Sequence, residues 1–269
     1  MKIAIVTGAS SGIGEAFLRE LVKTDGAFGR SFDQIWIIAR RMDKLEALRN
    51  ELGDSVVPLK MDLTAPEDIV ILEDKLRSEK PKVDLLINCA GMGKRGTVFD
   101  NSLDDLEKTV ELNCNCLTKI TRICLPYMTE DNPDYKNGPR ILNIASSAAF
   151  LPQPGFSVYA ASKSYVTSFS RALRVEVRKF NIGVTTVCPG PVKTEFLKKA
   201  TDNKEGDFTG IRALCAADPV KLAKASLKAA RKGRGMLVYK VSQKALHVAS
   251  KIVPTSLILW VEKVTMKQC

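Results

Sequence analysis

Histidine, paired cysteines and long apolar runs are scarce or absent in this chain of 269 residues. A single histidine, His247, argues against zinc sites and against hydrolases that need a histidine base. The seven cysteines are odd in number, scattered and without a Cys-x-x-Cys pair, which favours reduced thiols over a disulfide framework. No apolar run approaches the roughly 18 residues of a membrane span, and none resembles a signal peptide. We therefore expect a cytoplasmic protein without a metal centre.

Positive charge is concentrated in the last part of the chain. Residues 1–192 carry 25 Lys/Arg and 24 Asp/Glu, whereas residues 193–269 carry 16 and 6. One interpretation is a solvated helical surface. The other is a face that meets anions, such as an acidic substrate, a nucleotide phosphate or a lipid surface. No nucleic-acid partner is predicted.

The first fourteen residues, MKIAIVTGASSGIG, are typical of a dinucleotide-binding turn. Residues 3–7 predict a buried strand, three glycines interrupt it, and helical apolar spacing follows. Glycine lets a pyrophosphate reach backbone N–H groups at a helix N-terminus, where a Cβ would block it. Two alternatives are a tight turn without a ligand and a nucleophile elbow centred on Ser10.

Strands and helices alternate along the rest of the chain. Further strands are predicted at 34–39, 55–60, 83–88, 141–145, 182–188 and 236–239, with long helices at 103–128 and 158–179. This order predicts an α/β fold, a single Rossmann-type doubly wound parallel sheet with helices on both faces. The predicted single domain, 1–269, comprises a cofactor-binding and catalytic core (1–192), a substrate-loop region (193–218) and a basic C-terminal segment (219–269).

Unusual residues gather where the predicted strands end, which is where such sheets bind ligands. Arg40 and Arg41 follow the second strand, at the place where an acidic residue would bind a ribose 2′-hydroxyl. Two guanidinium groups suit a 2′-phosphate, and hence NADP(H) rather than NAD(H). The alternative is two solvated arginines at the start of a helix.

Tyr159 and Lys163 lie four residues apart and share one face of a predicted helix. An ammonium beside a phenol lowers the phenol pKa from its reference value of ~10, and a cationic nicotinamide would lower it further. Such a tyrosine can serve as general acid or base towards a carbonyl or an alcohol. Ser146 ends the fifth strand, where its hydroxyl can reach the same carbonyl oxygen. The alternative is an ordinary surface contact between Tyr159 and Lys163.

These motifs together resemble the short-chain dehydrogenases/reductases, over residues 1 to about 196. TGASSGIG (7–14) is similar to the cofactor motif of that family. NCAG (88–91) is similar to its Asn-Asn-Ala-Gly segment, with Cys89 in place of the second asparagine. PGPVKT (189–194) resembles the stretch that closes on the nicotinamide. The places of the catalytic tetrad are held by Asn113, Ser146, Tyr159 and Lys163.

The resemblance implies roles for these residues. Tyr159 would be the acid/base, Lys163 would hold the nicotinamide ribose, and Ser146 would orient the substrate oxygen. Asn113 would anchor a water in a proton relay, and Arg40 would select NADP(H), although serines stand where many NADP(H)-using members have a basic residue. The cofactor-binding set is Gly8, Ser10, Ser11, Gly12, Ile13, Gly14, Arg40, Arg41, Asp62, Leu63, Asn88, Ala90, Gly91, Tyr159, Lys163, Pro189, Gly190, Val192 and Thr194.

The substrate is predicted to be a ketone or secondary alcohol with an apolar body, such as a steroid, a bile acid or a lipid-like compound. Residues that could line its pocket are Met92, Phe150, Leu151, Pro152, Phe156 and Phe196. The alternative substrate is a 3-oxoacyl thioester, whose carrier phosphate would suit the basic segment. A nucleotide-sensing regulator would be expected to lose the tyrosine–lysine pair. A homodimer or homotetramer is expected from the family.

The basic C-terminal segment contains a predicted helix that Pro254 ends. Helical spacing is followed by the apolar residues Val241, Ala245, Val248 and Ile252, and Lys240, Lys244 and Lys251 lie on another side. The apolar run 257–261 contains Trp260. Basic residues beside apolar ones and a tryptophan are typical of an interfacial helix. One interpretation is therefore a weak contact with anionic membranes. The other is packing over the substrate cleft or at a subunit contact.

Overall fold

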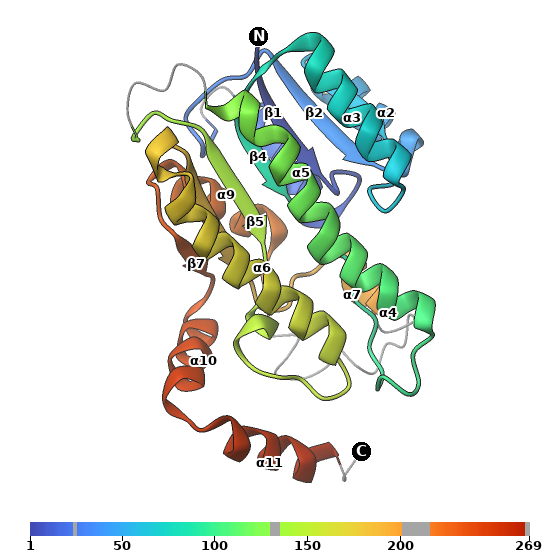
Figure 1. Ribbon diagram of the computed structural model, residues 1–269, viewed down its shortest axis with the longest axis vertical. Coiled ribbons are helices and arrows are strands. Elements are labelled where there is room, and N and C mark those ends of the chain that lie inside the picture. The colour runs from blue at the N-terminus through green and yellow to red at the C-terminus, as the bar shows by residue number, and fades with distance from the viewer. Residues whose placement is uncertain (24–25, 130–134, 201–215, 267–269) are drawn as a thin grey trace.

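The computed structural model describes residues 1–266 apart from 24–25, 130–134 and 201–215 (Figure 1). In this part of the chain, seven parallel strands form one sheet in the order β3-β2-β1-β4-β5-β6-β7. The strands are β1 Lys2–Thr7, β2 Gln34–Ala39, β3 Val56–Lys60, β4 Lys82–Asn88, β5 Arg140–Ile144, β6 Gly183–Cys188 and β7 Met236–Val238. The predicted doubly wound parallel sheet is confirmed. Most of the predicted substrate-loop region lies outside the described residues.

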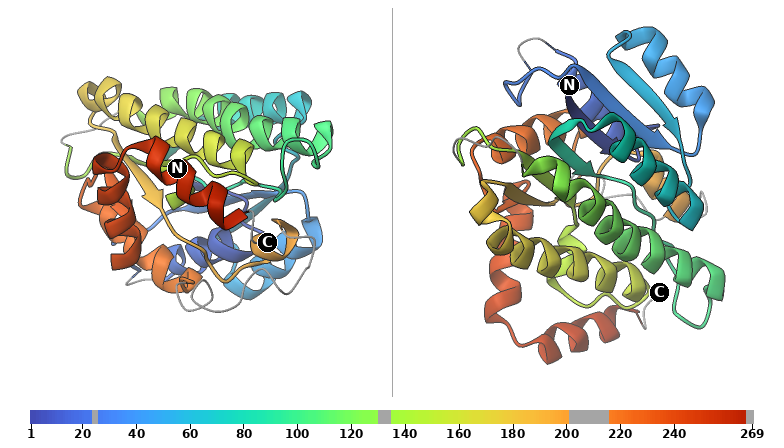
Figure 2. Two further views of the ribbon diagram at one scale, coloured as in Figure 1. Left: turned by 90° about the horizontal axis from the view of Figure 1, so that it is seen from below. Right: turned by 45° about the horizontal axis from the view of Figure 1, so that its top comes forward.

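Helices cover both faces of the sheet because its central strands are apolar on both sides (Figure 2). In β1, Ala4 and Val6 face one core cluster, and Ile3 and Ile5 face the other. The first face carries α1 Gly12–Leu21, α2 Met42–Leu52 and α9 Pro219–Arg231. The second carries α3 Pro66–Glu79, α5 Leu117–Cys124 and α6 Ser157–Glu176.

The predicted long helix at 103–128 is interrupted in its middle. It consists of α4 Leu103–Val110, a π-helical turn at Glu111–Cys116, α5, and a 3₁₀ turn at Leu125–Met128. The π turn contains Asn113, whose side chain exchanges two hydrogen bonds with the backbone of Met92, of 2.8 and 2.9 Å. A π turn widens the helix locally and is often found at functional sites. Here it brings Asn113 against the chain that follows β4.

Short elements complete the carboxyl side of the sheet. They are the 3₁₀ turn Ser147–Phe150 and the helices α7 Glu195–Ala200, α10 Val241–Ile252 and α11 Thr255–Met266, whereas the 3₁₀ turn Arg178–Phe180 precedes β6 at the opposite edge. The helices α10 and α11 lie beyond the carboxyl ends of the strands (Figure 1). The predicted break at Pro254 separates them. In the described residues no helix combines the length and the apolar character needed to cross a membrane.

Candidate active site

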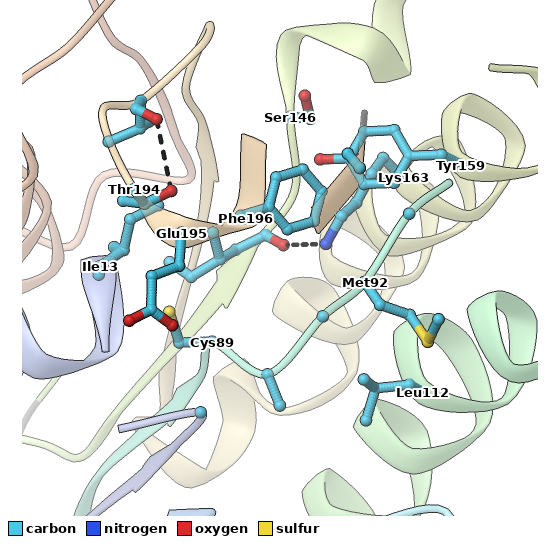
Figure 3. Close-up of a pocket in the computed structure, with 18 of the residues that line it drawn as sticks. Ile13, Cys89, Met92, Leu112, Ser146, Tyr159, Lys163, Thr194, Glu195 and Phe196 are labelled. Carbon is cyan, nitrogen blue, oxygen red and sulfur yellow. Dashed lines mark hydrogen bonds between the residues drawn. The ribbon is translucent and has the colours of Figure 1, made fainter. Parts of the chain in front are cut away.

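A cleft of about 1120 Å³ opens at the carboxyl ends of the strands. It contains nearly all the residues that the sequence singled out, and Figure 3 shows several of them around its centre. The predicted site residues that line the cleft are Gly8, Ser10, Ser11, Gly12, Ile13, Gly14, Arg40, Arg41, Asp62, Leu63, Ala90, Gly91, Ser146, Tyr159, Lys163, Pro189, Gly190, Val192 and Thr194. Asn88 and Asn113 are the predicted site residues that do not line it.

The turn between β1 and α1 forms one end of this cleft. Gly8 adopts a φ of 69°, and its N–H donates to the Ile38 carbonyl at 2.9 Å. A Cβ on Gly14 would collide with the carbonyl oxygen of Gly8. Ser11, at the N-cap of α1, makes no side-chain hydrogen bond to the first turn. The N-terminal N–H groups of α1 therefore face a cradle that only glycine leaves open, which fits a pyrophosphate.

The two arginines after β2 differ in their surroundings. The Nε and Nη2 atoms of Arg41 donate to Ser10 Oγ at 3.3 and 3.1 Å. Among the described residues, Arg40 makes a 3.8 Å ion pair with Asp62, and its side chain is 74% exposed against 35% for Arg41. Arg41 is thus held against the glycine turn, whereas Arg40 is free to reorient. The sequence predicted that both guanidinium groups suit a 2′-phosphate, with Arg40 in the selecting position of the family, and the structure places both beside the cleft.

The segment after β6 closes over the glycine turn. A Cβ on Gly12 would lie 3.0 Å from the Thr194 methyl group, so the two residues are in close contact. The next residue, Glu195, accepts a hydrogen bond from Arg41 Nη1 at 3.1 Å. The start of α7 is therefore tied to the part of the cleft that fits the cofactor.

The first turns of α6 place Tyr159 and Lys163 in the middle of the cleft. The Tyr159 ring stacks on Phe156 at 4.3 Å, and Lys163 Nζ lies 5.7 Å from the centroid of the Tyr159 ring. The Lys163 ammonium donates to the Ile144 carbonyl at 2.9 Å, at the end of β5 (Figure 3). Ser146, two residues further along, faces the same space.

Burial controls the protonation of this pair. It raises the pKa of Tyr159 to about 12, an effect that a hydrogen bond with Ser146 opposes. Burial also lowers the pKa of Lys163 to about 8. The sequence predicted that Lys163 would lower the pKa of the phenol. In the protein alone the pKa is instead raised, because the loss of hydration on burial dominates, and the lowering expected with a cationic nicotinamide bound stays a prediction.

The two asparagines hold the framework of the site. Asn88 is buried at the end of β4 and donates to Thr121 at 3.0 Å and to Asn143 at 2.9 Å. Its side chain links β4 to α5 and β5 and does not line the cleft, and its assignment as a cofactor-binding residue stays a prediction. Asn113 is also buried, and its amide donates to Ser162 Oγ at 2.9 Å as well as to the Met92 carbonyl. Asn113 therefore does not line the cleft itself but supports Met92, which does.

Other side chains in the cleft were not predicted as site residues. Lys94 and Arg95 line it, with the Arg95 guanidinium 5.9 Å from the centroid of the Phe156 ring. Gln243 reaches it from α10, and its Oε1 atom is buried without a hydrogen-bond partner among the described residues. Nothing in the local sequence signals Gln243, because its place depends on how α10 returns to the sheet.

The predicted set of residues lining an apolar pocket is only partly correct. Met92, Phe156 and Phe196 line the cleft, and Phe196 lies 5.5 Å from the Tyr159 ring. Phe150, Leu151 and Pro152 do not line it, and the Phe150 ring instead packs 4.3 Å from His247. The Ser10 hydroxyl accepts hydrogen bonds from Arg41, whereas the His247 ring packs on Phe150, so among the described residues each has a different partner.

The fold and this cleft define an oxidoreductase of the short-chain dehydrogenase class. The family model for short chain dehydrogenase matches residues 2–205, and the chain belongs to that family. Nodulation protein G of a Rhizobium species is 31% identical over 250 residues, which cover 93% of each chain. NADP-dependent 3-hydroxy acid dehydrogenase YdfG of Salmonella typhi is 32% identical over 209 residues, 76% of this chain and 79% of that one.

A much longer relative and two solved structures are also similar. Glycine betaine reductase ATRR of Emericella nidulans is 33% identical over 237 residues, which are 86% of this chain but 18% of that protein. A short-chain dehydrogenase from Sphingobium yanoikuyae in complex with NADPH has a TM-score of 0.75 and 26% identity, covering 100% of this chain and 96% of that one. The 3-ketoacyl-(acyl-carrier-protein) reductase from Brucella melitensis complexed with NADH has a TM-score of 0.74 and 25% identity, with coverages of 88% and 96%.

Proposed function

We propose that this protein is an NADP(H)-dependent oxidoreductase that interconverts a ketone and a secondary alcohol, with Tyr159 as the acid/base. The observation that carries the proposal is the position of Tyr159, Lys163 and Ser146 around one space in the cleft. The glycine cradle and the two arginines beside it fit a dinucleotide with a 2′-phosphate. The relative from Salmonella typhi is NADP-dependent, and the structure from Sphingobium yanoikuyae contains NADPH.

The side chains divide the chemistry between them. When bound, the nicotinamide supplies or accepts the hydride. The Tyr159 hydroxyl gives its proton to the carbonyl oxygen during reduction and takes a proton from the alcohol during oxidation. The Ser146 hydroxyl donates to the same oxygen and so orients it. The Lys163 ammonium is fixed by the Ile144 carbonyl and favours the phenolate when Tyr159 loses its proton.

The apolar side chains of the cleft support an apolar ketone as the substrate, and two cationic side chains support a second candidate substrate. Met92, Phe156 and Phe196 provide the apolar lining, whereas Lys94 and Arg95 would suit the phosphate of a carrier-bound 3-oxoacyl thioester. Consumption of NADPH with steroid-like, bile-acid and lipid-like ketones, compared with 3-oxoacyl thioesters, separates the two. The proposed activity fails if the protein binds NADPH but reduces no ketone or thioester. An assembly of two or four copies stays a prediction.

Replacing either arginine is expected to weaken NADPH more than NADH. A guanidinium–phosphate hydrogen bond contributes about 1.5–3 kcal/mol, so Arg40→Ala and Arg41→Ala should each raise the Kd of NADPH by about 10- to 150-fold. Paired fluorescence titrations of NADPH and NADH measure the difference. Arg77→Ala on α3 is the control, because its ion pairs with Glu73 and Asp74 lie outside the cleft. Equal losses for both cofactors would rule out contact with the 2′-phosphate.

The two directions of the reaction are expected to differ in their response to pH. Reduction needs a protonated Tyr159, whose pKa of about 12 keeps its proton in place through neutral pH. The rate of reduction should therefore be nearly constant around neutral pH. It should fall above about pH 8, where Lys163 loses its charge. Oxidation needs the phenolate, whose fraction grows with pH below the Tyr159 pKa, and should accelerate as the pH rises from neutral towards 8 while Lys163 keeps its charge. Profiles of kcat/KM in both directions test this, and a reduction that accelerates with rising pH would contradict it.

A further inference from the structure

The helix α10 has two faces of different character. Gln243 and His247, four residues apart, face the protein: Gln243 packs on Gly190, and the His247 ring lies 4.3 Å from the Phe150 ring. Val241, Val248 and Ile252 are spaced by seven and four residues and share the opposite face. Their side chains are 79%, 55% and 75% exposed. The inner face attaches α10 to the cleft, and the outer face carries an apolar stripe open to solvent.

The next helix continues this exposed apolar surface. In α11, Leu257 and Trp260 are 51% and 62% exposed. We call α10 and α11, residues 241–266, the C-terminal arm. Both helices lie beyond the carboxyl edge of the sheet, on the side where the cleft is found (Figures 1 and 2). Large exposed apolar groups that are adjacent along an arm are typical of an interaction surface.

Charge distinguishes between the surfaces that could cover this stripe. Lys244 and Lys251 are exposed on α10 beside the apolar stripe. From residue 241 to residue 261 the chain contains these two lysines and no Asp/Glu. Two copies that met through their arms would bring lysines against lysines, which opposes association. An anionic surface instead attracts both lysines.

We propose that the C-terminal arm binds the surface of an anionic lipid bilayer. Val241, Val248, Ile252, Leu257 and Trp260 would enter the boundary between headgroups and acyl chains, and the lysines would meet lipid phosphates. Tryptophan is favoured at this depth because its ring is apolar and its N–H can stay hydrated. Because the inner face of α10 contacts Gly190 and Phe150, bound arms would hold the mouth of the cleft close to the bilayer.

Co-sedimentation with vesicles tests the proposal on the full chain. Wild-type protein is expected to bind vesicles of phosphatidylcholine with phosphatidylglycerol at low salt, to bind less at high salt, and to bind vesicles of pure phosphatidylcholine weakly. The pair Val248→Ser/Ile252→Ser and the pair Lys244→Glu/Lys251→Glu should each lower the partition coefficient on anionic vesicles by about tenfold or more. NADPH binding and circular dichroism verify that these variants are folded.

Matched changes outside the arm separate a specific surface from overall charge. Lys221→Glu/Lys228→Glu makes the same charge change at the same spacing on α9, where both lysines are exposed. Ile71→Ser removes a similarly exposed apolar residue from α3. Both controls should retain wild-type binding.

Three results would overturn the proposal. They are no binding of the wild-type protein to anionic vesicles at low salt, equal losses in the arm and control variants, and dissociation of an oligomer by Val248→Ser/Ile252→Ser. The last result, measured by analytical ultracentrifugation, would assign the stripe to a second copy of this chain.

Discussion

Tyr159→Phe is expected to lower kcat for the best ketone by about a hundredfold to ten-thousandfold, the range for loss of a general acid. The substitution removes one oxygen atom and keeps the ring, which stacks on Phe156 at 4.3 Å and contacts Phe196. The shape of the cleft and its affinity for NADPH should therefore be almost unchanged. Steady-state kinetics together with NADPH titration measure the two effects separately.

Tyr165→Phe is the matched control for this change. Tyr165 lies on the same helix, α6, but its hydroxyl is exposed and lies 2.9 Å from the Thr118 hydroxyl, away from the cleft. Its loss should leave kcat within about twofold, as is usual for a surface hydroxyl. If Tyr159→Phe retained the wild-type kcat while Tyr165→Phe also did so, the proton would have to come from another group.

Gly14→Ala is expected to damage both stability and cofactor binding. The added methyl would collide with the carbonyl oxygen of Gly8, so the turn must shift. Overpacking of this kind costs about 1–3 kcal/mol of unfolding free energy. A shift that misplaces more than one backbone donor, each contributing about 1.5–3 kcal/mol towards a phosphate, should raise the Kd of NADPH by more than about a hundredfold. Urea unfolding and fluorescence titration test the two parts.

Gly53→Ala provides the comparison for Gly14→Ala. Gly53 follows α2 with a φ of 104°, and an added Cβ there would have no heavy atom within 4 Å. This variant should lose stability through its backbone conformation alone and should bind NADPH like the wild type. Wild-type NADPH affinity in Gly14→Ala would show that the glycine turn does not form the pyrophosphate site.

Local patterns in the sequence were sufficient to predict the sheet and the centre of the cleft. Short apolar runs predicted each strand to within one residue of its observed ends. This worked because a strand that is buried on both faces consists almost entirely of apolar residues. The glycines after β1 and the pair Tyr159 and Lys163 were found because their chemistry depends on residues close together in the chain. The resemblance to a family added Asn113 and the segment at 189–194.

Features that depend on packing between distant segments could not be predicted in this way. Both Arg40 and Arg41 follow β2, and only the hydrogen bonds to Ser10 show that Arg41 is the anchored one. Asn88 was assigned to the cofactor by its motif, but its partners Thr121 and Asn143 come from other elements. The raised pKa of Tyr159 follows from burial, which is a property of the assembled cleft.

The path of the C-terminal arm was also beyond sequence reasoning. Periodicity predicted a helix before Pro254, and that helix is observed as α10. Periodicity alone left open whether its apolar residues would cover the cleft or face outwards. The structure shows a division of roles, with Gln243 in the cleft and Val248 and Ile252 in solvent.

Transfer of deuterium from NADPH that carries deuterium at both hydrogen positions of nicotinamide C4 tests the central claim most directly. The reaction is run with the best ketone from the panel, and the alcohol is analysed by mass spectrometry and NMR. The account predicts deuterium on the carbinol carbon of the product formed by the wild-type protein, and about a hundredfold or greater loss of this product with Tyr159→Phe. An alcohol formed without deuterium at that carbon would contradict the account.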